Sequence, residues 1–323
     1  MRQAMAEAEV GDDVFGDDPT VIRLQEIAAE TLGTEAALFL PSGTQSNLCA
    51  LLSHCERGDE YIVGQHAHTY MYEGGGAAVF GSIQPQPLDF MPDGTLDLEQ
   101  VAACIKADNP HFAKSRLLCL ENTQGGKVLP LAYLPKARAV ADQYGLGLHL
   151  DGARVFNASV KLNVPVTDIT HHFDSISVCL SKGLCAPVGS VLCATQEIIG
   201  KAHRWRKMLG GGMRQAGVVA AAGILAITEQ VQHLQTDHEN AQQLAKAMSD
   251  LPGLDVDPGL VQTNIVFAQI TNGSRQDLMQ KMQSEGVLVS GLRDTLRLVT
   301  HFDFKKEQIE PVAAAFSRAL QTS

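Results

Sequence analysis

Two residues at the ends of short, mostly apolar runs have the types needed for covalent and electrostatic chemistry. Asp151 ends the run that begins at Leu148, and Lys182 follows the run 175–180 with Ser181 between them. A lysine among apolar walls and other cations loses its proton more easily and becomes a nucleophile for Schiff-base formation. A buried aspartate needs a cationic partner, such as a protonated pyridine nitrogen. The alternatives are an ion pair of Asp151 with Arg154 and a Lys182 side chain that extends into solvent.

The segment Pro-Ser-Gly-Thr-Gln-Ser-Asn, residues 41–47, could bind an anion. It follows an apolar run and opens a stretch of helical composition, and free N–H groups at a helix N-terminus attract anions. Gly43 lets the backbone approach a phosphate closely, and Ser42 and Thr44 could donate to its oxygens. No Gly-Lys-Ser/Thr follows, so this is not a Walker loop. The alternative is an ordinary capped helix start.

A second candidate for anion binding is the cationic segment Arg204-Trp-Arg-Lys207, followed by three glycines and Arg214. The alternative is a solvated, flexible connector. Taken together, an anion cradle, a strand-end aspartate and a strand-end lysine are the parts of a pyridoxal 5'-phosphate enzyme. The cradle would hold the phosphate, Asp151 would keep the pyridine nitrogen protonated, and Lys182 would form the Schiff base.

The elements that must position these residues are predicted from hydrophobic pattern. Short apolar runs without strict alternation are typical of strands buried on both faces. Stretches of helical composition lie between several of them, including residues 44–55, 96–107 and 133–144, and a first helix begins near Asp18 and ends at Gly33. We therefore predict an α/β fold with a mostly parallel, seven-stranded sheet between helices. The expected strands are residues 36–40, 61–64, 77–83, 116–120, 147–150, 175–180 and 189–194.

The character of the chain changes after Arg214. Residues 215–250 are almost continuously helix-forming, and shorter apolar runs and a final amphipathic stretch near 306–320 follow. We predict an N-terminal arm over residues 1–15, a large cofactor-binding domain over 16–233 and a smaller α+β domain over 234–323.

Composition excludes several classes of protein. The chain has 323 residues and a formal net charge of −11, which argues against nucleic-acid or anionic-membrane partners. Its seven cysteines include no CxxC pair, so no metal site is expected, and free thiols fit a reducing compartment. The polar, acidic start is unlike a signal peptide, and no apolar stretch is long enough to span a bilayer. We expect a cytoplasmic protein.

Several ordered motifs resemble one family over nearly the whole chain. They are GDDVFGDDPT, LPSGTQSN, ENTQGGKVLP, LHLDGAR, LSKGL, APVGS, RWRKMLGGGMRQ and RLVTH. They resemble the low-specificity L-threonine aldolases, pyridoxal-phosphate enzymes of fold type I (aspartate aminotransferase-like). The resemblance implies retro-aldol cleavage of L-threonine and L-allo-threonine to glycine and acetaldehyde. It also implies a homotetramer, built as a dimer of dimers with shared sites.

The resemblance assigns roles to residues of this chain. Lys182 matches the Schiff-base lysine, Asp151 the partner of the pyridine nitrogen, and Arg154 the arginine near the phenolic oxygen of the ring. The other assignments follow the same motifs: Gly43 and Thr44 for the phosphate, His68 rather than His66 at the ring face and in proton transfer, Arg297 for the substrate carboxylate, and Arg214 near the phosphate of a neighbouring subunit.

The chain departs from the family at three places. Gln124 stands where many relatives carry a histidine near the substrate hydroxyl, and glutamine cannot exchange a proton near neutral pH. Phe15 stands where relatives often have tyrosine, and relatives begin with about a dozen further residues that include an Arg-Ser-Asp-Thr-type segment. Two alternative functions therefore stay open. One is another amino-acid lyase or hydroxymethyltransferase, and the other is an inactive cofactor-binding scaffold.

Overall fold

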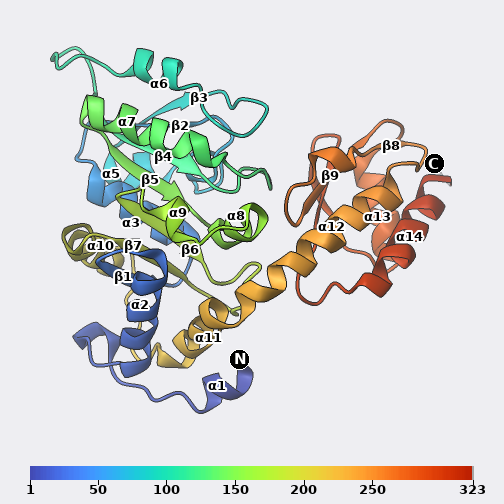
Figure 1. The fold of residues 1–323 in the computed structure, drawn as a ribbon, viewed down its shortest axis with the longest axis horizontal. Coiled ribbons are helices and arrows are strands. Elements are labelled where there is room, and N and C mark those ends of the chain that lie inside the picture. The colour runs from blue at the N-terminus through green and yellow to red at the C-terminus, as the bar shows by residue number, and fades with distance from the viewer. Residues whose placement is uncertain (322–323) are drawn as a thin grey trace. The chain divides into compact units, whose positions relative to one another are not determined.

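The computed structural model describes residues 1–321 as two compact units (Figure 1). The first unit comprises Met1–Gln124 and Leu129–Val231. The second comprises Gly125–Val128 together with the chain from Gln232 onward. Sequence reasoning placed the boundary after residue 233 and did not assign residues 125–128 to the C-terminal part. No helix among the described residues is long and apolar enough to cross a membrane.

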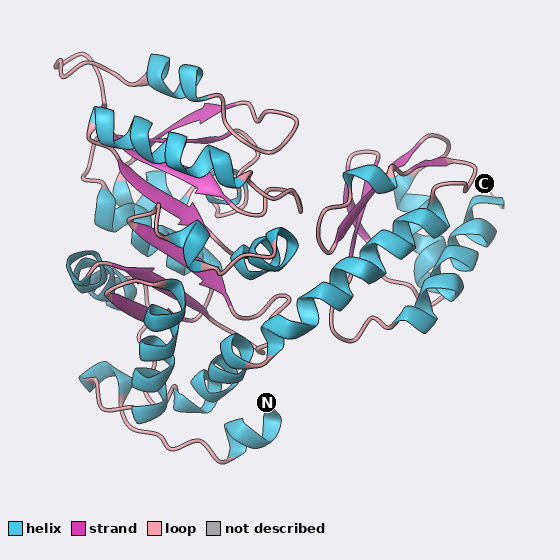
Figure 2. Cartoon of the chain, in the orientation of Figure 1, coloured by secondary structure: helices cyan, strands magenta, loops and turns pink. Residues whose placement is uncertain are grey.

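A seven-stranded sheet forms the centre of the first unit, in the order β1-β7-β6-β5-β4-β2-β3. Figure 2 shows strands in magenta and helices in cyan. The neighbours from β3 through β2, β4 and β5 to β6 are parallel, whereas β7 is antiparallel to both β6 and β1. The inner strands are almost wholly buried, as expected for a sheet covered on both faces. The strands are β1 (Ala36–Leu40), β2 (Asp59–Gly64), β3 (Gln84–Leu88), β4 (Lys114–Glu121), β5 (Gly147–Asp151), β6 (Ser175–Cys179) and β7 (Ser190–Ala194).

Helices lie between most of these strands in the chain. The first long one begins and ends as its sequence predicts, because the Asp18 side chain accepts hydrogen bonds from Thr20 N and Val21 N, and Gly33 closes it at φ 69°. The helices of this unit are α1 (Arg2–Ala6), α2 (Pro19–Leu32), α3 (Gly43–His54), α4 (His68–Met71), α5 (Gly76–Gly81), α6 (Leu98–Cys104), α7 (Leu134–Tyr144), α8 (Val155–Leu162), α9 (Thr167–Thr170), α10 (Gln196–Met208) and α11 (Gly217–Thr228), with 3-10 turns at Asp13–Phe15, Leu131–Tyr133 and Gln230–His233.

The predicted fold class is confirmed, but one strand was predicted in the wrong place. Residues 77–83 were expected as a strand, and most of them form α5 instead, since a run of Gly, Ala, Val and Phe suits either structure. The seventh strand is β3, which carries Pro85 and Pro87. It lies at the edge of the sheet, where a residue without an N–H is tolerated.

The second unit pairs a four-stranded antiparallel sheet, in the order β10-β11-β9-β8, with three helices. One face of the sheet packs into an apolar core that includes Val266, Leu296, Leu298 and Phe316. The elements are α12 (Leu234–Met248), β8 (Leu254–Asp255), β9 (Ile265–Ile270), α13 (Arg275–Ser284), β10 (Ser290–Leu292), β11 (Thr295–Val299) and α14 (Ile309–Gln321), with 3-10 turns at Pro258–Leu260 and Lys306–Gln308.

Candidate active site

Polar residues gather at the carboxyl ends of neighbouring parallel strands in the first unit. Glu121 and Asp151 are the last residues of β4 and β5 and lie opposite each other in register. His68 begins α4 just after β2, and Lys182 follows β6. In open α/β sheets, ligands bind beyond this edge. The fold therefore brings His68, Asp151 and Lys182 to the same edge of the sheet.

The Asp151 carboxylate is buried at this edge of the sheet. Asp151 is 2% exposed, and its Oδ2 accepts from Asn47 Nδ2 at 2.9 Å while its Oδ1 accepts from Ala153 N at 3.1 Å. Its carboxylate oxygens also lie close to His68 and Glu73, since ligand atoms of these three residues are within 4.8 Å of one another. A buried carboxylate held by neutral N–H donors fits a site that receives a cationic ligand.

His68 forms a hydrogen-bonded pair with a buried glutamate. Its Nδ1 lies 2.8 Å from Glu73 Oε1, and its ring is 40% exposed while Glu73 is 4% exposed. The hydrogen bond to Glu73 raises the pKa of His68, and burial raises the pKa of Glu73. Because Nδ1 is occupied, Nε2 is the nitrogen available to a substrate.

Glu121 is a further carboxyl group at this edge that sequence reasoning did not single out. Its Oε2 accepts from the backbone N–H of His68 at 2.7 Å, which fixes the start of α4. Desolvation, reinforced by the neighbouring Asp151 charge, raises the pKa of Glu121 well above its usual range. The Lys182 charge acts on both Glu121 and His68, which places it within electrostatic reach of both.

The expected phosphate cradle has the predicted local structure. Ser42 caps α3 by accepting from Gln45 N at 3.2 Å, and Gly43 and Thr44 form the first turn. A Cβ at Gly43 would lie 2.6 Å from Cys179 Sγ, so the space admits only glycine there. Burial raises the pKa of the Cys179 thiol, while the Lys182 and Arg154 charges act in the opposite direction. Lys182, Arg154 and the N-terminus of α3 therefore all lie near the Cys179 side chain.

The remaining predicted residues lie elsewhere in the described chain. Arg214 pairs with Asp12 (Nε to Oδ2, 2.8 Å) and lies over the Phe15 ring, and its side chain is 62% exposed. Gln124 is half-buried at the end of the first unit's first segment. Arg297 belongs to β11 of the second unit and lies opposite Phe267 on β9. A role of Arg214, Gln124 or Arg297 toward cofactor or substrate stays a prediction.

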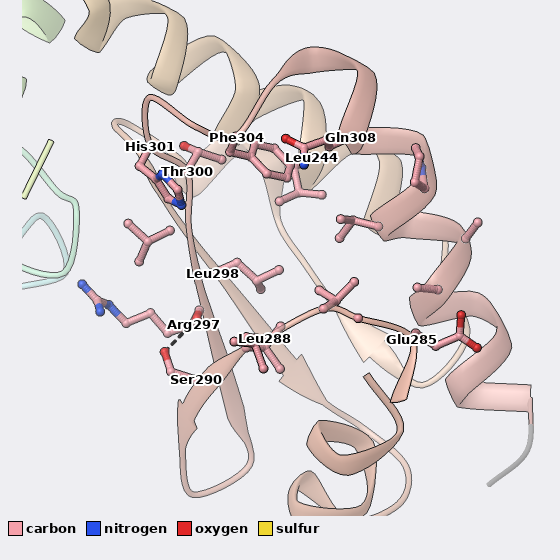
Figure 3. Close-up of a pocket in the computed structure, with 18 of the residues that line it drawn as sticks. Leu244, Glu285, Leu288, Ser290, Arg297, Leu298, Thr300, His301, Phe304 and Gln308 are labelled. Carbon is pink, nitrogen blue, oxygen red and sulfur yellow. Dashed lines mark hydrogen bonds between the residues drawn. The ribbon is translucent and has the colours of Figure 1, made fainter. Parts of the chain in front are cut away.

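A cavity of about 840 Å³ in the second unit is a different feature (Figure 3). Its walls come mainly from β11, α14 and the segment 285–290, and they include both apolar and polar side chains. Arg297 contributes to its rim, but its guanidinium extends away from Leu288 and Glu285 (Figure 3). His68, Asp151 and Lys182 are not among its lining residues, so this cavity is not the candidate active site.

Sequence reasoning also missed Asn47 and Glu73, which complete the first unit's site. Asn47 Nδ2 donates to both Glu73 Oε1 (2.8 Å) and Asp151 Oδ2 (2.9 Å). The signal was present for Asn47, because it is a polar residue inside the buried stretch of α3. His68, Glu73 and Asp151 have ligand atoms within 4.8 Å of one another, as in a metal site. However, the Asn47 N–H groups already satisfy both carboxylates.

Comparison with known proteins adds three findings. The family model for beta-eliminating lyases matches residues 1–271. The low specificity L-threonine aldolase of Escherichia coli K12 is 53% identical, and the match covers 97% of this chain and 93% of that protein. Low-specificity L-threonine aldolase 1 of Arabidopsis thaliana is 42% identical, and the match covers 100% of this chain and 93% of that protein. Among solved structures, Leishmania major threonine aldolase has a TM-score of 0.80 at 20% identity (97% and 92% covered), and Sphingomonas wittichii serine palmitoyltransferase has 0.78 at 19% (99% and 82%). At these identities the two structures support the fold alone.

Proposed function

The chain belongs to the beta-eliminating lyases and, among them, to the low-specificity L-threonine aldolases, and on this premise we propose that it binds pyridoxal 5'-phosphate in the first unit. It cleaves L-threonine and L-allo-threonine to glycine and acetaldehyde. The observation that carries the cofactor assignment is Asp151, a buried carboxylate at the carboxyl end of β5 that accepts a hydrogen bond from the neutral Asn47 amide. A protonated pyridine nitrogen supplies its cationic partner.

The residues around Asp151 fit the rest of the cofactor. Lys182 would supply the amine for the cofactor's aldehyde carbon, and the α3 N-terminus with Gly43 and Thr44 would hold the phosphate. Arg154 is assigned to the phenolic oxygen, and Arg214 to the phosphate of a neighbouring subunit in a homotetramer. When bound, the cofactor supplies an electron sink that accepts the electron pair of the broken Cα–Cβ bond.

The chain's own residues bind the substrate and move its proton. Arg297 is assigned to the substrate carboxylate, which a guanidinium can grip with two parallel hydrogen bonds. Gln124 is assigned to the β-hydroxyl as a hydrogen-bond partner. His68 Nε2 takes the β-hydroxyl proton, because its Nδ1 is held by Glu73. A positioned general base of this kind contributes about 10²–10⁴-fold to the rate.

The test is acetaldehyde release from L-threonine by the purified protein with added cofactor. Lys182→Ala should abolish both activity and the visible absorbance of the bound cofactor. Lys201→Ala changes an exposed lysine paired with Glu197 and should leave both unchanged. Absence of product at saturating cofactor would overturn the proposed activity.

Two further measurements separate this function from its alternatives. A hydroxymethyltransferase would convert serine to glycine with folate much faster than it cleaves threonine. An inactive scaffold would bind the cofactor, but its spectrum would not respond to glycine. We place the protein in the cytoplasm, a proposal supported by its seven free cysteines.

A further inference from the structure

Four polar side chains join α3 to the sheet beneath it in one continuous hydrogen-bonded chain. Asn47 and His54 lie seven residues apart on α3, which is about two helical turns and places them on the same face. The chain runs from His54 Nε2 to Ser175 Oγ (2.8 Å), from Ser175 Oγ to His149 Nδ1 (2.7 Å), and from His149 Nε2 to Asn47 Oδ1 (3.2 Å). It ends at Asp151 and Glu73 through the Asn47 amide nitrogen. The helix therefore contacts the sheet through polar groups that reach the active site.

The contacts of Asn47 determine which atom donates and which accepts in each hydrogen bond of this chain. Both protons on Asn47 Nδ2 are used by carboxylates, so Oδ1 can only accept, and His149 Nε2 must donate. His149 is 0% exposed, and burial lowers its pKa to about 3, so it is neutral and carries this single proton. Its Nδ1 must then accept from the Ser175 hydroxyl. Ser175 Oγ in turn accepts from His54 Nε2–H.

The direction of these hydrogen bonds matters because it prevents the side-chain amide of Asn47 from rotating by 180°. A rotated amide would present its oxygen to Asp151 and Glu73, and three acceptor groups would then face one another without a proton. In a buried place this arrangement is costly, because Asp151 Oδ2 and Glu73 Oε1 both lose the amide donor and face the amide oxygen instead. If His149 carried its proton on Nδ1, its Nε2 would accept, and it would favour the rotated amide.

We propose that Asn47, oriented by the hydrogen-bonded chain His54–Ser175–His149, is a positioning residue that holds the Asp151 carboxylate in place for the cofactor and Glu73 in place for His68. This inference rests on the proposed function, because it assigns Asp151 to the pyridine nitrogen. Neither His149 nor Ser175 contacts the reacting atoms. They act through Asn47 alone.

Two serines on β6 provide a matched pair of variants. Ser175 and Ser177 are both 0% exposed and both use Oγ in contacts with α3. Ser177 Oγ donates to Ser46 Oγ at 2.7 Å and is not part of the chain. Ser175→Ala removes the donor to His149 Nδ1, whereas Ser177→Ala removes a buried hydroxyl of the same kind without affecting Asn47.

The first measurement does not depend on bound cofactor. Nitrogen-15 NMR of histidine-labelled, cofactor-free protein should show His149 and His54 as Nε2–H tautomers. Ser175→Ala should shift His149 toward Nδ1–H, and Ser177→Ala should leave it unchanged. An Nδ1–H tautomer of His149 in the unmodified protein would overturn the inference, whether or not either variant folds.

The second measurement is cofactor affinity by spectroscopic titration. Ser175→Ala should weaken binding about tenfold or more, because a rotated Asn47 amide no longer donates to the Asp151 carboxylate, while Ser177→Ala stays within about twofold. Equal effects of the two variants would show a merely structural role and overturn the proposal. If the unmodified protein binds no cofactor, the proposed function fails, and the tautomer measurement still decides the direction of the chain.

Discussion

The Nδ1 atom of His68 lies 2.8 Å from Glu73 Oε1, and that same oxygen accepts from Asn47 Nδ2 at 2.8 Å. One carboxylate oxygen thus holds both the candidate proton acceptor and the amide that contacts Asp151. The geometry ties the basicity of His68 to the residues beneath the cofactor site.

We expect Glu73→Gln to move the acidic limb of the kcat/KM profile to lower pH. The hydrogen bond to Glu73 raises the pKa of His68, since it stabilises the imidazolium, so a neutral amide in its place lowers that pKa. His68 then becomes a free base at lower pH, although with less driving force for proton transfer. Glu197→Gln, at an exposed glutamate, is the control. An unchanged acidic limb would exclude His68 as the base.

Asp151→Asn should have opposite effects on function and on stability. Removing the partner of a buried cation should weaken cofactor binding about 10²-fold or more. In the cofactor-free protein, however, the change removes a buried charge, so the midpoint of thermal unfolding should rise. Asp18→Asn is the contrasting variant, because Asp18 accepts from three backbone N–H groups and its loss should lower the midpoint. A lower midpoint for Asp151→Asn would indicate a structural role.

Two histidines of the hydrogen-bonded chain, His54 and His149, should contribute to unfolding of the protein at acid pH. Burial lowers the pKa of His54 to about 4 and of His149 to about 3, whereas both titrate near 6.5 when unfolded. The unfolded state therefore binds more protons between about pH 6.5 and 4, and stability falls as pH falls through this window, by about 1.4 kcal/mol per pH unit for each histidine.

Urea unfolding of the cofactor-free protein at several pH values measures this contribution. His54→Gln should flatten the dependence of unfolding free energy on pH below 6.5. His111→Gln, at an exposed histidine, is the matched control and should leave the slope unchanged. A slope that is the same in both variants would mean that His54 does not stay neutral in the folded protein.

Glycine-to-alanine changes at two helical positions should have different outcomes, one harmful to cofactor binding and the other favourable to stability. At Gly43 a methyl group would meet Cys179 Sγ at 2.6 Å, so Gly43→Ala should displace the α3 N-terminus and weaken cofactor binding. Gly200 lies inside α10 with nothing within 4 Å of its Cβ position, and Gly200→Ala should raise stability by about 1 kcal/mol. Calorimetry and cofactor titration measure both effects. If Gly43→Ala bound the cofactor with normal affinity, the first turn of α3 would not be part of the cofactor-binding site.

The positions of residues at the ends of buried strands were predictable from sequence. A charged residue at the end of a short apolar run marks the place where a buried strand reaches the surface. Asp151 and Lys182 are the examples, and the sheet places both at its ligand-binding edge. The helix signals at Asp18 and Gly33 were equally local and were confirmed.

The errors concern properties that are not local. The strand β3 contains two prolines, and only its position at the edge of the sheet makes them acceptable. Asn47, Glu73 and Glu121 come from three separate segments, and their hydrogen bonds depend on how those segments meet. Neither periodicity nor spacing reports such contacts.

The assignment of Gly125–Val128 to the second unit has a consequence for anyone who wishes to express the units separately. These residues are held there by hydrogen bonds from Val128 N to Gln262 Oε1 (2.8 Å) and from Thr263 Oγ1 to Gly126 O (2.8 Å). The backbone therefore passes from one unit to the other three times, and a stop codon after Val231 would leave a four-residue loop without its partners. A soluble fragment needs a redesigned linker between Gln124 and Leu129, and a chimaera must exchange this loop together with the C-terminal segment.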